Sequence, residues 1–275
     1  SGTGTNLLKF YLDGVNIYEE TSTLDFSATS YKGMVATIED NVDYVYKGYI
    51  DEVRFSNTAR YTADFDVPTA AFEDDQYTKL LLHMDGADDG TSFPDSSGTA
   101  GGRHTITANG DVTQTRAVKK IGDSSILFDG NGDYLSIPST SDFAIGTGDF
   151  TLECWVYPTD TGASTRIIDL RTGSSEGYQI GRSAADAFEF HSERGSYTLS
   201  DASLSADTWY HVAAVRESGV VYTYVNGVSG DNGADTGDYS DNLPANVGAK
   251  WNAAAGQFWE GNMDEIRFSN VARYT

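Results

Sequence analysis

Apolar and polar residues alternate along most of the chain, in short runs that are separated by Gly, Asn, Asp and Ser. Alternation with a period of two is typical of a strand that buries one face. The pattern predicts ten strands, at residues 80–84, 125–128, 134–137, 150–157, 166–170, 178–181, 187–191, 209–216, 220–225 and 262–268. Because helical periodicity is weak, we expect an all-β fold, a sandwich of two antiparallel sheets.

Two dipeptides predict β-hairpins. Asn226-Gly227 follows the alternating run at 220–225, and Asp13-Gly14 stands in a similar place near the N-terminus. A two-residue type I′ turn needs a positive φ at both central positions, which Asn, Asp and Gly adopt readily. Each dipeptide therefore predicts a tight turn between two strands.

The sequence also repeats itself. Residues 51–62 (DEVRFSNTARYT) recur as 264–275 (DEIRFSNVARYT), with ten of twelve positions identical at a spacing of 213 (264 minus 51). The same spacing aligns YLDG at 11–14 with YVNG at 224–227. This period is far longer than that of solenoid repeats, so it predicts tandem copies of one domain.

The repeat sets the expected domain boundaries. Residues 1–62 correspond to 214–275 and are predicted to be the C-terminal part of one copy, residues 63–79 a linker with a proline and several acids, and residues 80–275 one complete copy. An isolated hairpin is marginally stable and its open edges recruit partners. The chain is interpreted as a fragment of a longer polypeptide, or as one whose N-terminal third pairs with strands from elsewhere.

Charge excludes two classes of partner. The chain has 41 acidic and 18 basic residues and a formal net charge of −23. No basic stripe is available for nucleic acid, and no apolar run approaches the ~18 residues of a membrane span, so neither partner is expected. The acids are mostly Asp, which is typical of turns and calcium loops. A solvated surface suited to salty surroundings explains the same excess.

The single cysteine, Cys154, excludes an intrachain disulfide and a cysteine-based zinc site. It alternates in phase with Leu152 and Val156. We therefore predict a buried, inert thiol.

Seven motifs occur in order and carry a family resemblance. The set resembles the laminin-G-like, concanavalin A-like jelly-roll family, whose members have two curved antiparallel sheets and are mostly non-catalytic. The FSNxARYT tail resembles the bacterial and phage subset, which includes surface adhesins, tail fibres and other virion proteins. The motifs are LLLHMDG (80–86), PDSSG (94–98), SILFDGNGDYLSIP (125–138), GDFTLECWVYP (148–158), DTWYHVAAVR (207–216), YVNG (224–227) and GNMDEIRFS (261–269).

The resemblance implies a calcium ion at the rim, held by Asp side chains and backbone carbonyls. It makes the first and last strands neighbours, which brings Asp85 near Asp264, with Asp95 completing the group. Asp51 is the counterpart of Asp264 in the first copy. Alternatively, Asp85 and Asp95 form turns and Asp264 caps a loop or pairs with Arg267.

A second acidic group, Asp129, Asn131 and Asp133, has spacing similar to the first half of an EF-hand loop. No Glu stands at the twelfth position, which excludes an EF-hand. We expect a plain β-turn there.

Aromatic residues give a candidate sugar site. Trp251 lies in a Gly/Ala-rich loop with little apolar periodicity, and Asn252, Arg182 and His191 are its expected neighbours in ligand binding. Burial under its own loop, or contact with a neighbouring subunit, explains Trp251 as well. Trp155 and Trp209 lie in clear strand patterns and are predicted to be in the core.

Catalytic motifs are missing from the sequence. The Glu-x-Asp-x-x-Glu pattern of related glucanases, in which two carboxyl groups face one cleft, does not occur. The chain is therefore expected not to be an enzyme, with a glycan hydrolase kept as an alternative.

The resulting expectation is a non-catalytic surface or virion module for attachment to a glycan or a cell-surface protein. Its expected location is extracellular, on a virion or a bacterial surface. A purely structural subunit of a fibre or shell, making contacts with copies of itself in a homo-oligomer, is the alternative. The repeated Arg54 and Arg267 are expected to form ion pairs that close the edge of the sandwich.

Overall fold

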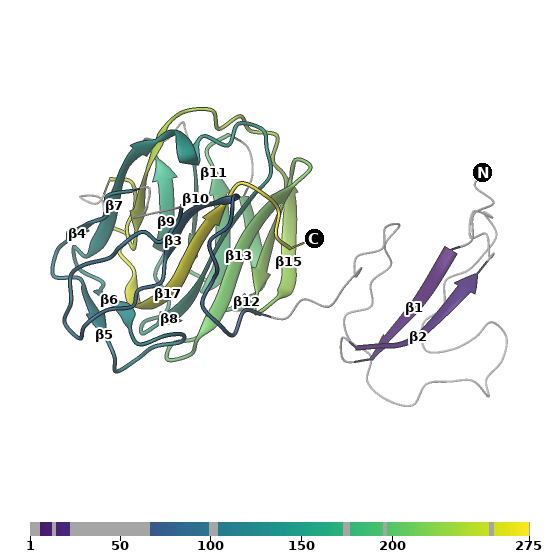
Figure 1. The fold of residues 1–275 in the computed structure, drawn as a ribbon, viewed down its shortest axis with the longest axis horizontal. Helices are drawn as coiled ribbons and strands as arrows, with labels where there is room; N and C mark the ends of the chain where they lie inside the picture. Colours follow the sequence, from purple (N-terminus) through teal and green to yellow (C-terminus); the bar gives the residue numbers. More distant parts are fainter. Residues whose placement is uncertain are drawn as a thin grey trace. The chain divides into compact units, whose positions relative to one another are not determined.

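The computed structural model describes residues 6–12, 15–22, 67–98, 104–172, 177–194, 197–252 and 256–274. The chain divides into two units, Ser1–Asp64 and Phe65–Thr275 (Figure 1). The first unit contains a two-stranded antiparallel hairpin of β1 (Asn6–Leu12) and β2 (Val15–Ser22). The turn residues Asp13 and Gly14, and Asp51 and Arg54 further along, lie outside the described residues.

The second unit consists of two antiparallel sheets, as the alternating pattern predicts. The seven-stranded sheet has the order β12 (Tyr197–Ser203), β11 (Ala187–Ser192), β10 (Gly177–Arg182), β9 (Thr165–Arg171), β16 (Leu243–Val247), β7 (Tyr134–Thr140) and β4 (Thr107–Asn109). The eight-stranded sheet has the order β15 (Val228–Ala234), β14 (Val220–Val225), β13 (Tyr210–Glu217), β8 (Phe150–Pro158), β17 (Glu260–Ser269), β6 (Ser125–Asp129) and β5 (Thr113–Thr115), with β3 (Thr78–Leu82) paired to β17. A single 3₁₀ turn, η1 (Ser141–Phe143), follows β7 among the described residues.

All ten predicted strands are present, with ends that differ by a few residues. The hairpin prediction at Asn226-Gly227 is confirmed, since both residues have positive φ, 51° and 78°. Strands β4, β5, β12 and β16 were not predicted. The first two have three residues each, β12 is mostly polar, and β16 contains a proline, so none shows clear alternation.

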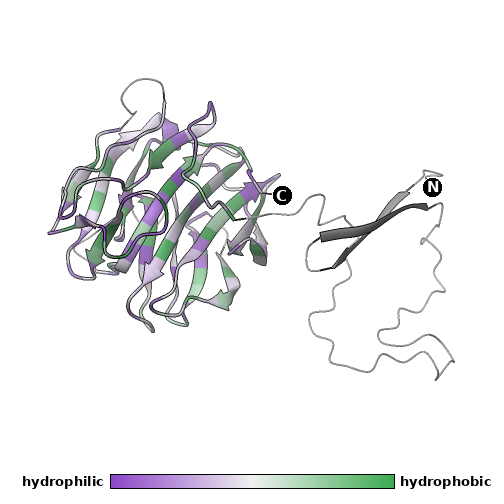
Figure 2. Ribbon diagram, turned by 60° about the horizontal axis from the view of Figure 1, so that its bottom comes forward, coloured by the Kyte–Doolittle hydropathy of each residue, from purple (hydrophilic) through white to green (hydrophobic). Residues whose placement is uncertain are grey.

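The core lies between the two sheets. Along the strands of this unit, hydrophobic residues alternate with hydrophilic ones (Figure 2). Aromatic rings from both sheets meet in the core, where the ring centroids of Phe150 and Tyr178 lie 5.1 Å apart. Cys154 is fully buried and burial raises its pKa well above the usual value, so the prediction of an inert thiol is confirmed. Trp155 is buried, but beside His211 on the opposite face of its sheet from Cys154, and Trp209 is only half-buried, against Tyr157.

Buried charges lie on the other face of the eight-stranded sheet. Glu153 of β8 accepts hydrogen bonds from Arg267 Nε (2.8 Å), His211 Nε2 (3.2 Å) and the Tyr274 hydroxyl (2.5 Å). Burial alone would raise the pKa of Glu153, but the hydrogen bond to His211 and the charge of Arg267 hold it below its usual value. The ion pair predicted for Arg267 is therefore present. It joins two neighbouring strands in the interior of the sheet, whereas the sequence predicted it at the edge of the sandwich.

The residues before β3 belong to this packing. Phe72 is 5% exposed, its ring lies 3.9 Å from the Arg267 guanidinium, and its N–H donates to Glu265 Oε2 at 2.7 Å. Asp75 accepts two hydrogen bonds from Arg273. Residues 67–77, which the sequence predicts as part of a linker, thus cover the buried charges. The acidic residues of this stretch favoured the interpretation as a linker, although Phe72 is buried.

We expect Glu153→Gln to lower the free energy of unfolding by about 3–5 kcal/mol, because it leaves Arg267 without a counter-charge inside the sheet. Urea denaturation at neutral pH measures the change. The matched control is Glu73→Gln at an exposed position, with an expected change within about 0.5 kcal/mol. Equal small effects for the two variants would contradict a structural role for this ion pair.

Candidate functional site

A row of polar residues crosses every strand of the seven-stranded sheet. In every strand but β12, the residues next to the row in sequence include side chains of the hydrophobic core or ones packed against it, such as Ile168 of β9 and Ile180 of β10. Because side chains alternate between the faces of a sheet, the row lies on the outer face. We call it the polar row, and the registers of six successive strand pairs align its members: Thr107, Ser136, Asn246, Asp169, Gln179, His191 and Tyr197.

Gln179 is the fifth of the seven members of the polar row and has an unpaired oxygen. Its side chain is 1% exposed. The Nε2 atom lies 3.4 Å from His191 Nδ1, whereas Oε1 has no hydrogen-bond partner among the described residues. A buried acceptor without a donor costs about 1–3 kcal/mol. The sheet therefore keeps an acceptor that a hydroxyl or amide group of a ligand can satisfy once the side chains that cover it move aside.

Ion pairs flank Gln179 on both sides. Arg171 donates to both oxygens of Asp169, at 2.8 and 2.6 Å, and also to Glu193. Burial opposes the charge of Arg171, but the hydrogen bonds to Asp169 and Glu193 raise its pKa. The charges close to Gln179 are thus paired and fixed in position.

A second pair lies toward the end of the row. Arg166 donates to Glu189 at 2.9 Å, and the Tyr197 hydroxyl donates to the other oxygen of Glu189 at 3.1 Å. Burial raises the pKa of Tyr197, with Glu189 adding to the shift. Arg166 reaches Glu189 across Gly181, where an added Cβ would meet Arg166 Nη1 at 3.3 Å and the Thr165 carbonyl at 2.4 Å. The glycine thus leaves room for the ion pair.

The loop that carries Trp251 is attached to the same face. The Trp251 N–H donates to Asp169 Oδ2 at 3.0 Å, and the Asn246 amide donates to the carbonyls of Lys250 and Trp251. Trp251 is half-buried and Asn252 is exposed beside it. The structure therefore brings Trp251 and His191, two of the predicted ligand-binding residues, to the polar row.

Arg182 lies elsewhere. Its side chain is fully buried, its guanidinium lies 5.5 Å from the ring of Trp259, and it donates to Asp160 Oδ1 at 2.6 Å. Arg182 is in phase with Ile180 along β10, so strand alternation turns it to the core side. The same alternation could have identified Gln179 and Asp169, which the sequence analysis missed.

The predicted calcium ligands each have hydrogen-bond partners of their own. Asp85 accepts from Asp123 N at 2.6 Å and Asp264 from Lys120 N at 2.9 Å, so both hold the loop before β6. Asp95 accepts from the backbone N–H of Leu81, Ser97 and His104, and from His104 Nδ1. The calcium set stays a prediction.

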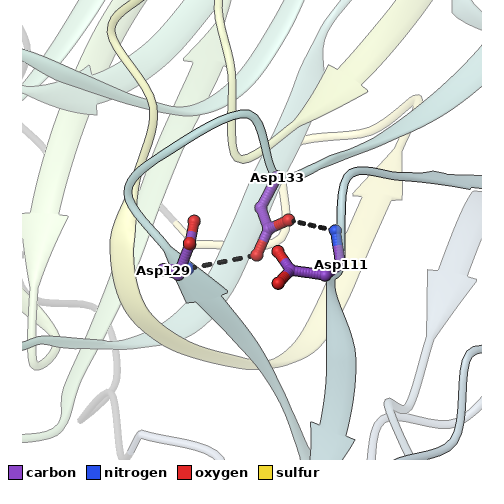
Figure 3. A group of neighbouring side chains, drawn as sticks. All are labelled: Asp111, Asp129 and Asp133. Carbon is purple, nitrogen blue, oxygen red and sulfur yellow. Dashed lines mark hydrogen bonds between the residues drawn. The ribbon is translucent and has the colours of Figure 1, made fainter.

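Another trio of carboxylates comes within metal-ligand distance in the described ranges. Asp111, Asp129 and Asp133 each have an oxygen within 4.8 Å of the others (Figure 3). Asp133 is 2% exposed and accepts from Asp111 N at 2.8 Å and Asp129 N at 3.2 Å. Burial, with the nearby Asp129, raises the pKa of Asp133. Asn131 N donates to Asp129 Oδ1 at 2.7 Å, as in the predicted turn.

The fold and these sites describe a β-sandwich module with a polar sheet face. Residues 129–274 match the family model of the concanavalin A-like lectin/glucanases superfamily, and the chain belongs to this family. No curated protein matches the sequence.

Solved structures share the fold at low identity. Domain 4 of AbnA, a GH43 extracellular arabinanase from Geobacillus stearothermophilus, in complex with arabinotriose, is 19% identical, with a TM-score of 0.53 over 71% of this chain and 93% of that one. The binding domain of Paraclostridial Mosquitocidal Protein 1 is 13% identical (TM-score 0.55), and that of botulinum neurotoxin serotype D is 13% identical (TM-score 0.53). Each toxin alignment covers 71% of this chain and 49% of the toxin chain.

In the described part of the chain, no helix has the length and apolar character needed to cross a bilayer.

The anchoring role of Asp264 predicts a pH dependence of stability. Burial raises the pKa of Asp264 to about 7, despite three backbone N–H donors. Between its unfolded pKa near 4 and its folded value, the unfolded chain has released this proton and the folded chain keeps it. Stability from this group therefore falls as the pH rises across that window.

Comparison with Asp264→Asn, which cannot titrate, isolates this contribution. Between pH 5 and pH 7, we expect the unfolding free energy of the natural chain to fall by about 2 kcal/mol relative to the variant, measured by urea denaturation. A difference that is constant or grows with pH would show that the N–H donors keep Asp264 ionised.

Proposed function

We propose that the second unit is a non-catalytic module that binds an extended glycan along the polar row. The unpaired, buried Oε1 of Gln179 carries this proposal, because the charged groups around it are paired and it is left as an acceptor. A sugar hydroxyl both donates and accepts hydrogen bonds, so it suits Gln179 and the neighbouring His191. The arabinotriose complex of a protein with the same fold supports a carbohydrate as the ligand class.

The geometry of the row suits a chain-like ligand. Strands lie about 4.8 Å apart, so a row across seven strands is about 29 Å long. Tyr197 is 56% exposed at one end of the row, and the Trp251 loop lies near its middle. Both rings can stack on sugar faces while the polar groups between them fix the orientation.

The carboxylates Asp169 and Glu189, on the outer face of the seven-stranded sheet, are already hydrogen-bonded to other residues of the protein. Asp169 is engaged by Arg171 and by the Trp251 N–H, and Glu189 by Arg166 and Tyr197. A glycosidase needs two carboxyl groups free to face the scissile bond. We propose instead binding without chemistry, as part of an extracellular protein of a bacterial surface or a virion, the setting that the FSNxARYT tail resembles.

We expect Gln179→Met to abolish glycan binding while the melting temperature changes little. The variant keeps the volume, removes the unpaired Oε1 and gives up only the long 3.4 Å contact of Nε2 with His191 Nδ1, so its net cost to stability is small. Binding is measured on a glycan array and then by calorimetry with the best glycan, with at least a tenfold loss of affinity expected.

The matched control is Gln114→Met. Gln114 is also buried, but its Nε2 donates to the Ser92 carbonyl at 3.2 Å. We therefore expect this variant to lower the melting temperature and to leave binding unchanged. Glycan binding that survives in Gln179→Met would exclude the polar row as the site.

We further propose that Asp111, Asp129 and Asp133 hold a calcium ion, since carboxylate oxygens from loops are the ligands it prefers. Excess Ca²⁺ should then raise the melting temperature relative to EDTA, because binding to the folded state alone stabilises it. Asp129→Asn should abolish the shift, and Asp231→Asn, at an exposed position, should keep it. A shift that persists in Asp129→Asn and is lost in Asp85→Asn would favour the ligand set predicted from the sequence.

A further inference from the structure

The two hairpins of the chain share one register. When 213 is added to the residue numbers of β1 and β2, five of their pairs coincide with pairs of β14 and β15. The registers of both hairpins shift at the same place, next to Phe10 in β1 and Thr223 in β14. The coinciding pairs are Leu7↔Thr21 with Val220↔Ala234, Leu8↔Glu20 with Val221↔Gly233, Lys9↔Glu19 with Tyr222↔Asn232, Tyr11↔Asn16 with Tyr224↔Ser229, and Leu12↔Val15 with Val225↔Val228.

This coincidence is independent of sequence identity. Between 6–10 and 219–223, no residue is identical, and the match there rests on strand pairing. The repeated dodecapeptide at 51–62 and 264–275 gives the same spacing of 213 from a different part of the sequence. Pairing and sequence therefore agree that β1 and β2 are the counterparts of β14 and β15.

In the sandwich, β14 is held on its second edge as well. It pairs with β13 through Val225↔Val212 and Tyr224↔Ala213, and its residues Val221, Thr223 and Val225 are buried. In the described residues, β1 pairs with β2 alone. The register positions of the three buried residues are occupied in β1 by Leu8, Phe10 and Leu12, all apolar. A hairpin with such a strand needs a neighbouring strand and a core.

The repeated dodecapeptide indicates which charged groups a partner of the first hairpin would carry. In the second unit, Arg267 and Tyr274 bind the buried Glu153, and Arg273 binds Asp75. Their sequence counterparts are Arg54, Tyr61 and Arg60. At a spacing of 213, no residue of 1–62 corresponds to Glu153 or Asp75. We expect a partner that meets this dodecapeptide as the second unit does to bring two carboxylates.

We infer that β1 and β2 belong to a second β-sandwich, in which β1 is added to an open strand of the β13 type in a partner that carries the counterpart of Glu153. The partner is thus a laminin-G-like β-sandwich that lacks its last strands. This inference does not depend on glycan binding, because it uses no residue of the polar row.

To test the inference, the missing strands are supplied from the chain's own sequence. A copy of residues 67–213 is fused directly before residue 1 of the full chain, so that residue 1 takes the place of residue 214. We expect the amides of residues 6–22 to exchange with deuterium at least tenfold more slowly than in the chain without the extension, as mass spectrometry measures. Glu153→Gln in the added copy alone should reverse much of this protection. Equal exchange of residues 6–22 with and without the extension would overturn the inference.

A disulfide pair tests the register separately. Directly opposed residues of neighbouring strands are close enough for a disulfide, whereas residues displaced by three positions are not. With both copies of Cys154 replaced by Ala, Leu12→Cys and Val212→Cys in the added copy should cross-link on mild oxidation, as the Val225↔Val212 pair implies. The control pairs Leu12→Cys with Val215→Cys in the added copy and should stay reduced. Cross-linking in the control alone, or in neither protein, would contradict the register.

Discussion

The pairing of Glu153 with Arg267 is the interaction on which the second unit depends most. Strand β17 is hydrogen-bonded to β8, β6 and β3, so the last strand of the chain lies in the interior of its sheet. It brings Asp264, Glu265 and Arg267 into buried positions. Buried charges are tolerated only when they are paired and hydrogen-bonded. Glu153 of β8 pairs with Arg267, the loop before β6 donates to Asp264, and Phe72 N–H donates to Glu265, with the segment at 67–77 covering this face.

The polar row follows from the opposite constraint on the other sheet. The inner face of the seven-stranded sheet is filled by residues such as Ile180 and Phe190, and the strict period of two then places Gln179 and His191 on the outer face. Because a shift by one residue would exchange the two faces, the core packing fixes the alignment of the row. Strands therefore position the candidate binding groups, apart from Trp251, which a loop carries.

Alternation and turn residues were sufficient to predict the ten main strands and the β14–β15 hairpin, because both signals are local. The polar row could be predicted only in part. His191 and Trp251 stand out as residue types, but Gln179 and Asp169 become significant only when the registers of six strand pairs are known. Arg182 was misplaced for the same reason, since its face depends on its phase along β10. The meeting of Asp111 with Asp129 and Asp133 joins the start of β5 to the β6–β7 turn, which sequence spacing does not reveal.

We have proposed that the outer face of the seven-stranded sheet of this concanavalin A-like domain binds a ligand. A crystal structure of the chain with the best-binding oligosaccharide is the most direct test. We expect a sugar over Gln179, with a hydroxyl donating to Oε1 and a ring against Trp251 or Tyr197. An oligosaccharide bound only at the loops around Asp111 and Asp133, with the polar row unchanged, would contradict it.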